Sequence, residues 1–260
     1  MGILNVTPDS FSDGGRYLDP GAAVDHGLHL LDSGADWLDV GGESTRPGSA
    51  KVPVEEELAR VIPVIRGLRR ARPDSVLSID TSKAAVAARA VEEGARVVND
   101  VTALSDPEMG PLCARMEVEL VLMHMRGSPG TMQHDTTYED LVGEVEDFLR
   151  DRAEAAMAYG IKREQILVDP GIGFGKAPLR NPDLIAAVPR FAALGYRVVV
   201  GASRKQFLSA LTGVSSPDDR VAGSIGAALA AAVRGAHVLR VHDVAATRQA
   251  LTVFQAVERS

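Results

Sequence analysis

Short runs of β-branched and aliphatic residues alternate with longer amphipathic, alanine- and leucine-rich segments along the whole chain of 260 residues. The short runs lack a polar–apolar alternation of period two, which is typical of strands that are covered on both faces. The predicted strands span residues 2–6, 36–40, 76–80, 96–101, 118–124, 165–169, 197–201 and 237–241. The predicted helices span residues 21–33, 54–72, 82–93, 107–116, 138–159, 181–193, 205–211 with 220–234, and 244–259.

Eight successive strand–helix units predict an α/β fold, a (β/α)8 TIM barrel of parallel strands with its active site at the carboxyl-terminal face. The alternative is an open doubly wound sheet, which usually has fewer strands. No linker or change in composition divides the chain, so we expect a single domain over residues 1–260. Pro63 lies within the helix predicted for residues 54–72 and predicts a kink or a break there.

Nearly every predicted strand ends in a polar or ionisable side chain. In chain order these side chains are Asn5, Asp39, Asp80, Asn99 with Asp100, His124, Asp169, Ser203, and Arg240 with His242. Because the strands of a parallel barrel end at one mouth, we expect these side chains to converge on one site. A single polar strand end is explained equally well by capping of the next helix, so the prediction depends on the whole set.

One group of these side chains suits a flat heterocycle. Asp80, Asn99 and Asp169 offer acceptors to a donor-rich edge, such as that of an amino-pyrimidinone, because a carboxylate accepts two parallel N–H bonds. Lys205, just beyond the strand at 197–201, complements a ring carbonyl or nitrogen. These four residues are the predicted heterocycle pocket.

A second group suits an anion. Arg46, Arg240 and His242 are hydrogen-bond donors, and Asn5 offers an oxygen that can help to hold Mg²⁺ beside the anion.

A glycine-rich loop follows the strand at 165–169. It reads Asp169-Pro170-Gly171-Ile172-Gly173-Phe174-Gly175-Lys176. Glycines let a backbone pass close to a neighbouring group without interference from a Cβ atom. We interpret the three alternating glycines as clearance for flat ligand rings.

Composition narrows the class of protein. A net charge of −7 and a pI near 5.4 argue against nucleic acid or an anionic membrane as the main partner. The single cysteine, Cys113, excludes an internal disulfide, fits a reducing compartment and is expected to be buried filler. No window approaches the ~20 apolar residues of a membrane span, and no signal peptide is evident, so a cytoplasmic protein is expected.

Several motifs together resemble the dihydropteroate synthase family of pterin-binding enzymes. The two longest are Asn5-Val6-Thr7-Pro8-Asp9-Ser10-Phe11-Ser12-Asp13-Gly14-Gly15 and Asp39-Val40-Gly41-Gly42-Glu43-Ser44-Thr45-Arg46-Pro47-Gly48. Shorter ones are Ser78-Ile79-Asp80-Thr81, Val98-Asn99-Asp100, Met123-His124-Met125, Asp169 to Lys176, Ser203-Arg204-Lys205 and Arg240-Val241-His242-Asp243-Val244. The resemblance covers essentially the whole chain in the family's order.

The resemblance implies a condensation of 6-hydroxymethyl-7,8-dihydropterin diphosphate with 4-aminobenzoate, which gives 7,8-dihydropteroate and pyrophosphate. It implies Mg²⁺ as cofactor and a homodimer as the assembly. The implied roles are pterin binding by Asp80, Asn99, Asp169 and Lys205, diphosphate binding by Thr45, Arg46, Arg240 and His242, metal binding by Asn5, and 4-aminobenzoate binding by Pro47, Phe174 and Ser203. Of these, Lys205, Arg46, Asp80 and His242 are the expected catalytic residues.

Two other functions are compatible with a pterin-binding barrel. A methyltransferase domain would share the pterin pocket but has no use for the long loops at residues 5–15 and 44–48. A non-catalytic paralogue would bind pterin without turnover, against which the presence of Asn5, Arg46, Lys205 and His242 argues.

Overall fold

The computed structural model describes residues 1–7, 19–44 and 48–258. Its eight strands are all parallel and are paired in the order β1 to β8. They are β1 (Gly2–Asn5), β2 (Trp37–Gly41), β3 (Val76–Asp80), β4 (Val97–Asp100), β5 (Glu119–Met123), β6 (Ile166–Asp169), β7 (Arg197–Val200) and β8 (Val238–Leu239). The prediction of eight parallel strands is confirmed.

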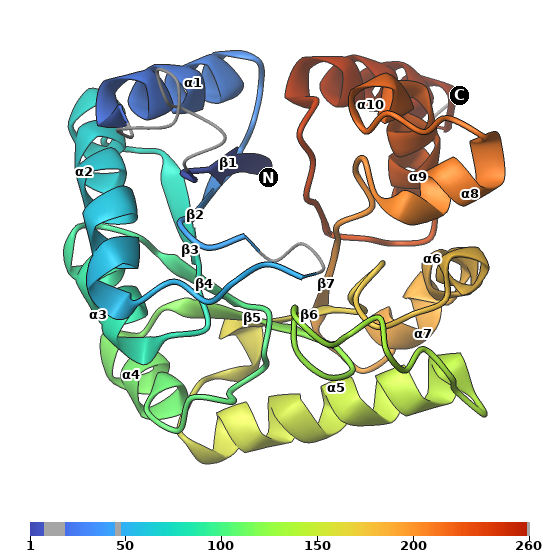
Figure 1. Cartoon of the computed structure of the whole chain (residues 1–260), viewed down its shortest axis with the longest axis horizontal. Coiled ribbons are helices and arrows are strands. Elements are labelled where there is room, and N and C mark those ends of the chain that lie inside the picture. The colour runs from blue at the N-terminus through green and yellow to red at the C-terminus, as the bar shows by residue number, and fades with distance from the viewer. Residues whose placement is uncertain (8–18, 45–47, 259–260) are drawn as a thin grey trace.

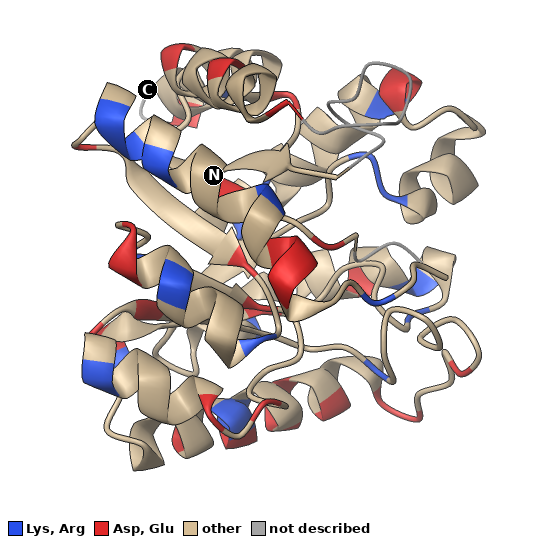
Figure 2. Ribbon diagram, turned by 60° about the vertical axis from the view of Figure 1, so that its left-hand side comes forward, with Lys and Arg blue, Asp and Glu red and all other residues tan. Residues whose placement is uncertain are grey.

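Helices alternate with the strands and surround the outside of the sheet (Figure 1). They are α1 (Pro20–Asp32), α2 (Val54–Ala71), α3 (Ala84–Glu92), α4 (Met109–Met116), α5 (Leu141–Ala158), α6 (Asn181–Ala186), α7 (Val188–Ala192), α8 (Gln206–Thr212), α9 (Val221–Val233) and α10 (Val244–Glu258). Short 3₁₀ turns lie at Arg163–Gln165, Pro178–Arg180 and Asp218–Arg220. Acidic and basic residues are interspersed along the outer helices (Figure 2).

The sheet curls so that its first strand meets the chain beyond its last. The amide of Ile3 donates to the carbonyl of Val241 at 3.0 Å, and the amide of Val241 donates to the carbonyl of Met1 at 3.0 Å. Val241 lies two residues after β8, so these bonds join β1 to the end of the β8 segment. The result is a barrel-like α/β fold.

Two predicted helix features differ in the structure. Helix α2 runs unbroken through Pro63, so of the predicted kink or break the break is wrong and the kink stays a prediction; proline removes only one intrahelical donor. The single helix predicted for residues 181–193 is divided at Ala187 into α6 and α7. Pro189 explains the division, because its ring clashes with the carbonyl four residues earlier and it has no N–H to donate.

Side chains alternate between two faces of the strands. In β6, Ile166 and Val168 pack into the large apolar layer between the sheet and the helices. Leu167 instead joins Val97, Val121 and Val199 in a separate small cluster, contributed by four neighbouring strands. Alternation places the next inward side chain of β6 at Asp169, so the apolar floor lies directly below the polar strand ends.

No described helix within residues 1–7, 19–44 and 48–258 is long and apolar enough to cross a membrane.

Candidate active site

Four of the predicted site residues lie at one end of the sheet. β1 ends at Asn5, β3 at Asp80 and β6 at Asp169. Asn99 is the second-last residue of β4 and is paired in register with Asp80. Parallel pairing therefore brings these polar side chains to the same edge, as the sequence predicts.

A buried network of ion pairs and hydrogen bonds joins β2, β3 and β4 to Arg240, which follows β8. The Arg240 guanidinium donates from Nε to Asp39 Oδ2 at 2.6 Å and from Nη2 to Asp80 Oδ2 at 2.7 Å. Asn99 Nδ2 donates to the same Asp39 oxygen at 2.9 Å, and Ser78 Oγ donates to Asp39 Oδ1 at 2.6 Å. Asp39 is fully buried and accepts three of these four bonds, so it is the centre of the network.

Asp39 is a residue whose role sequence reasoning missed. Its position at the end of a predicted strand was visible, but no role followed, because its partners come from residues 39, 60 and 201 positions away in the chain. The structure places Asp39 at the middle of β2 and not at its end. An aspartate inside an otherwise apolar strand is the available signal, since a buried carboxylate requires partners.

The charges in the network modify one another. Burial opposes the charge on Arg240, but Asp39 and Asp80 raise the pKa of its guanidinium. Burial raises the pKa of Asp80 to about 7, and Arg240 opposes that rise. Asp80 therefore titrates near neutral pH, where a change in protonation state changes its ability to accept hydrogen bonds.

Asp169 and Lys205 form the opposite side of the site. Asp169 Oδ1 accepts the amide of Gly171 at 2.7 Å, and burial raises the pKa of the carboxyl, an effect that Lys205 opposes. Lys205 Nζ donates to the carbonyl of Ile172 and lies 4.3 Å from the centre of the Phe174 ring. Burial lowers the pKa of Lys205 to about 7, and Asp169 opposes this.

The three glycines of the 171–175 loop lie close to other parts of the protein's own chain. All three have positive φ, between 67° and 83°. A Cβ atom at Gly171 would lie 1.9 Å from the carbonyl oxygen of His124, one at Gly175 would lie 2.8 Å from that of Arg126, and one at Gly173 would approach the Lys205 side chain at 3.2 Å. These glycines give clearance to the protein's own chain. Clearance for flat ligand rings stays a prediction.

His242 and Ser203 lie together after β8 and β7. Ser203 is buried, and its Oγ is 3.0 Å from His242 Nδ1 and 3.2 Å from the His242 amide nitrogen. Burial, with Arg240 nearby, lowers the pKa of His242 to about 4. The imidazole is therefore neutral at pH 7 and offers hydrogen bonds without a positive charge.

Three predicted residues, Thr45, Arg46 and Pro47, lie outside the described residues. Hydrogen bonds link the segments before and after these three residues. Glu43 Oε2 accepts the amide of Val52 at 2.8 Å and Lys83 Nζ at 2.6 Å. Lys83 also binds the fully buried Glu57. Residues 43 and 52 are thereby held at the base of this segment.

Asn5 is the protein donor at the candidate Mg²⁺ position. The half-buried Asn5 lies at the strand-end edge, and among the described residues no three His, Cys, Asp or Glu side chains gather as a metal site. Mg²⁺ commonly keeps several waters and takes phosphate oxygens as ligands, with only one or two ligands from the protein. Asn5 fits such an ion, held chiefly by a substrate.

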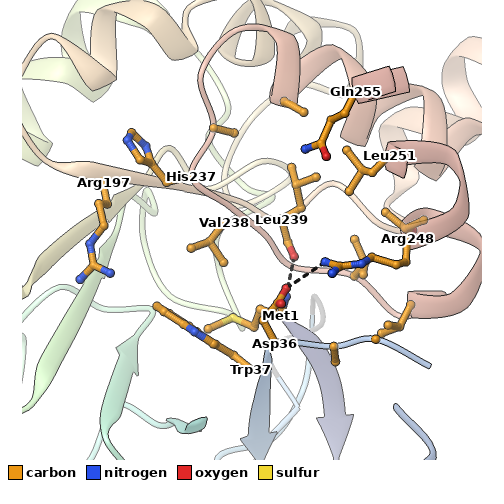
Figure 3. A pocket seen from close by; sticks show the side chains of 17 residues that line it. Met1, Asp36, Trp37, Arg197, His237, Val238, Leu239, Arg248, Leu251 and Gln255 are labelled. Atoms are coloured by element: carbon orange, nitrogen blue, oxygen red, sulfur yellow. Dashed lines mark hydrogen bonds and ion pairs between the residues drawn. The ribbon is translucent and has the colours of Figure 1, made fainter. Parts of the chain in front are cut away.

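Two cavities differ in their relation to these residues. One of about 390 Å³ lies under the loops that follow β2 to β5 and is lined by Asp80, Lys83 and Met125 among others. A larger one, of about 480 Å³, is lined by Trp37 and Arg197, the first residues of β2 and β7 (Figure 3). It lies at the amino ends of the strands and contains none of the predicted site residues.

Comparison with known proteins gives the family. The model of the pterin binding enzyme family matches residues 1–242.

The chain belongs to the pterin binding enzyme family.

Individual members of this family resemble the chain over nearly its whole length. Dihydropteroate synthase of Escherichia coli K12 is 43% identical, over 98% of this chain and 90% of that protein. The structure of Xanthomonas albilineans dihydropteroate synthase with 4-aminobenzoic acid superposes with a TM-score of 0.94 at 52% identity, covering 100% of this chain and 92% of that one. The same enzyme in complex with 7,8-dihydropteroate gives a TM-score of 0.91 at 50% identity, covering 100% and 93%.

The buried network makes a prediction for Asp39→Asn. The substitution leaves Arg240 buried beside one carboxylate instead of two, so we expect a loss of about 3–5 kcal/mol in the free energy of unfolding. Urea denaturation measures the loss. Asp36→Asn is the matched control, because Asp36 is 70% exposed and lies 3.4 Å from the exposed Arg248; its effect should stay within about 0.5 kcal/mol. Equal stability of the two variants would contradict the role of Asp39.

Proposed function

We propose that the chain is a dihydropteroate synthase. It condenses 6-hydroxymethyl-7,8-dihydropterin diphosphate with 4-aminobenzoate and releases 7,8-dihydropteroate and pyrophosphate. The observation that carries the proposal is the set of buried acceptors at one end of the sheet, Asp80, Asn99 and Asp169, in a chain half identical to an enzyme solved with 7,8-dihydropteroate. We further propose that the bonds between β1 and Val241 close the (β/α)8 barrel and that its carboxyl-terminal face is the active site.

The hydrogen bonds within the protein support the assignment of the pterin pocket. Asp80 uses Oδ2 for Arg240, Asp169 uses Oδ1 for Gly171, and Asn99 uses its amide nitrogen for Asp39. Each side chain thus keeps one acceptor oxygen for a ligand. Three acceptor oxygens match the donor-rich edge of a pterin, which carries an amino group and ring N–H groups.

Lys205 would act beside this edge. With its pKa near 7, the amine is a donor to a ring carbonyl or nitrogen in either protonation state. Its position above Phe174 is consistent with a cation that spans the pterin pocket and the predicted 4-aminobenzoate site. Ser203, together with Phe174 and Pro47, would shape that second site.

The diphosphate would be bound at the other side of the same mouth. His242 is a neutral donor there, and Arg240 contributes positive charge while it remains paired with Asp39 and Asp80. Thr45 and Arg46 would complete the anion site. When bound beside Asn5, Mg²⁺ would supply Lewis-acid stabilisation of charge on the diphosphate.

We propose a dissociative displacement for the chemical step. The C–O bond of the pterin methylene breaks, and its electron pair leaves with the diphosphate, which the donor groups stabilise. The neighbouring carboxylates Asp80 and Asp169 stabilise the positive charge left on the pterin. The lone pair of the 4-aminobenzoate nitrogen then forms the C–N bond, and the amine loses its proton to water. No protein nucleophile is required.

Cys113 is consistent with this absence of a protein nucleophile. It is buried in α4, and burial raises the pKa of its thiol to about 12. At neutral pH it stays a thiol, which is the unreactive form.

A homodimer in the cytoplasm completes the proposal. Helix α9 carries almost only apolar residues, yet just two of these, Ala228 and Ala231, are buried, together with Ser224. Beside it, α10 exposes Val253 and Val257. A helix that is apolar around its circumference is normally covered on every side, so we propose that a second copy of the chain packs on α9 and α10.

The test of the function is a turnover assay with both substrates. We expect pyrophosphate release that requires the pterin diphosphate and 4-aminobenzoate together, with 7,8-dihydropteroate formed in equal amount. Release without the amine would indicate a hydrolase, and pterin binding without release would indicate a non-catalytic paralogue.

The protonation of Asp80 predicts how pterin affinity depends on pH. Its folded pKa near 7 means that the acceptor form is lost as the pH falls below 7. We expect the association constant of a pterin analogue to rise from pH 6 to pH 8, by up to about tenfold per unit below the pKa. Calorimetry across this range measures it, and Asp80→Asn should flatten the dependence. A wild-type affinity that falls with rising pH would be inconsistent with a carboxylate acceptor.

The dimer proposal predicts the effect of charge on α10. Wild-type protein at micromolar concentration should sediment as a dimer, and the double variant Val253→Asp, Val257→Asp should sediment as a folded monomer. Leu179→Asp is the control, because Leu179 is as exposed as Val253 but lies in the turn before α6. A monomeric wild-type protein would exclude the proposed interface.

A further inference from the structure

Lys176 is buried at the end of the glycine-rich loop, with only 1% of its surface exposed. Its Nζ has four polar neighbours: the carbonyl oxygens of His124 at 3.0 Å, Gly171 at 2.9 Å and Phe174 at 2.9 Å, and the His124 Nδ1 at 2.8 Å. All four sit on the loops that follow β5 and β6. We call this arrangement, formed by Lys176 with His124, Gly171 and Phe174, the lysine cage.

The cage has the chemistry of a cation site. Three carbonyl oxygens and an imidazole nitrogen converge on one point, and an ammonium group supplies three N–H donors, one for each carbonyl oxygen. Burial lowers the pKa of His124 to about 3, so the imidazole is neutral. Burial also lowers the pKa of Lys176 well below its ordinary value, and Asp169 opposes that shift. The three carbonyl acceptors around Nζ favour the ammonium form, because a neutral amine has only two N–H donors. The positive φ values of Gly171, Gly173 and Gly175 allow the loop to bend around this point.

The loop held by the cage contacts the substrate-binding groups directly. The Phe174 ring packs with Met123 and Met132, and the carbonyl of Ile172 accepts a hydrogen bond from Lys205. The same ring lies under Lys205 Nζ. The cage therefore fixes the carbonyls of Gly171 and Phe174. The segment between them carries the two groups that contact Lys205, the Ile172 carbonyl and the Phe174 ring.

We propose that Lys176 is a positioning residue for the reaction, which holds Phe174 and Lys205 in the geometry that the second substrate requires. The inference rests on the proposed function. Lys176 itself contacts no substrate in this account, because all its hydrogen-bonding capacity is used within the cage. Its effect passes through the Phe174 ring and through the carbonyl of Ile172.

A positioning role of Lys176 and a purely stabilising one have different effects on the Michaelis constants. A lysine that only stabilises the fold would lower the melting temperature and the amount of active enzyme, and the folded fraction would keep its Michaelis constants. A positioning lysine changes the constant of the substrate that binds against Phe174. Truncation of its side chain also leaves a site that an external cation can fill.

The experiment uses the full chain with Lys176→Met and Lys176→Ala. For both variants we expect the KM for 4-aminobenzoate to rise at least tenfold, more than the KM for the pterin diphosphate. Propylammonium replaces the atoms that Lys176→Ala removes, so it should restore the KM of that variant. Propan-1-ol, which is uncharged, should not restore it, and Lys176→Met should not respond because its side chain fills the space. Lys162→Met is the control, since Lys162 is 61% exposed and should leave both constants unchanged.

The outcomes separate this inference from the proposed function. If wild-type protein turns over and both variants keep the wild-type KM for 4-aminobenzoate, or if propylammonium has no effect, the positioning role is overturned. If wild-type protein does not turn over, the proposed function fails instead. Should neither variant fold, nitrogen-15 NMR of the lysines in wild-type protein decides: Lys176 should show slowly exchanging Nζ protons that a pterin analogue leaves unshifted. Rapid exchange or a large shift on binding would overturn the inference.

Discussion

The buried ion pair between Asp39 and Arg240 is the interaction on which the rest of the site depends. An isolated charge in a protein interior is unstable, whereas a guanidinium shared between two carboxylates is stabilised by both. Asp39 and Asp80 come from β2 and β3, and Arg240 follows β8, 201 residues after Asp39 in the chain. The pair therefore fixes the mutual position of the first and last parts of the sheet and of the acceptors between them.

The same ion pair explains how an acidic pocket can bind a neutral ring and an anion side by side. Arg240 donates to one oxygen each of Asp39 and Asp80, and the Asn99 amide nitrogen donates to Asp39. The remaining acceptor oxygens of Asp80 and Asn99 are thereby held in fixed directions. On the other side, Asp169 and Lys205 shift each other's ionisation toward the charged forms. Opposite charges at fixed positions are the arrangement that stabilises charge separation when a bond to an anionic leaving group breaks.

Much of the architecture follows from local sequence, because each strand is a short apolar run that ends in a polar residue. Asp80, Asn99 and Asp169 could be predicted as neighbours because parallel strands align their ends. The central position of Asp39 in the buried network could not be predicted, since its partners depend on strand register and on distant segments. Nor could the role of Gly171, which avoids the His124 carbonyl, or the burial of Lys176, a residue type that is almost always exposed. The division at Ala187 is not evident from the apolar pattern of residues 181–193, which continues through Pro189.

The most direct test of the central claim is a crystal structure of this protein with bound 7,8-dihydropteroate. The account predicts that the pterin ring lies within hydrogen-bonding distance of Asp80, Asn99 and Asp169, with the aminobenzoate against Phe174 and the bonds from Arg240 to Asp39 and Asp80 intact. A pterin ring bound without contact to these acceptors, for example in the cavity beside Trp37 and Arg197 at the opposite end of the strands, would contradict it.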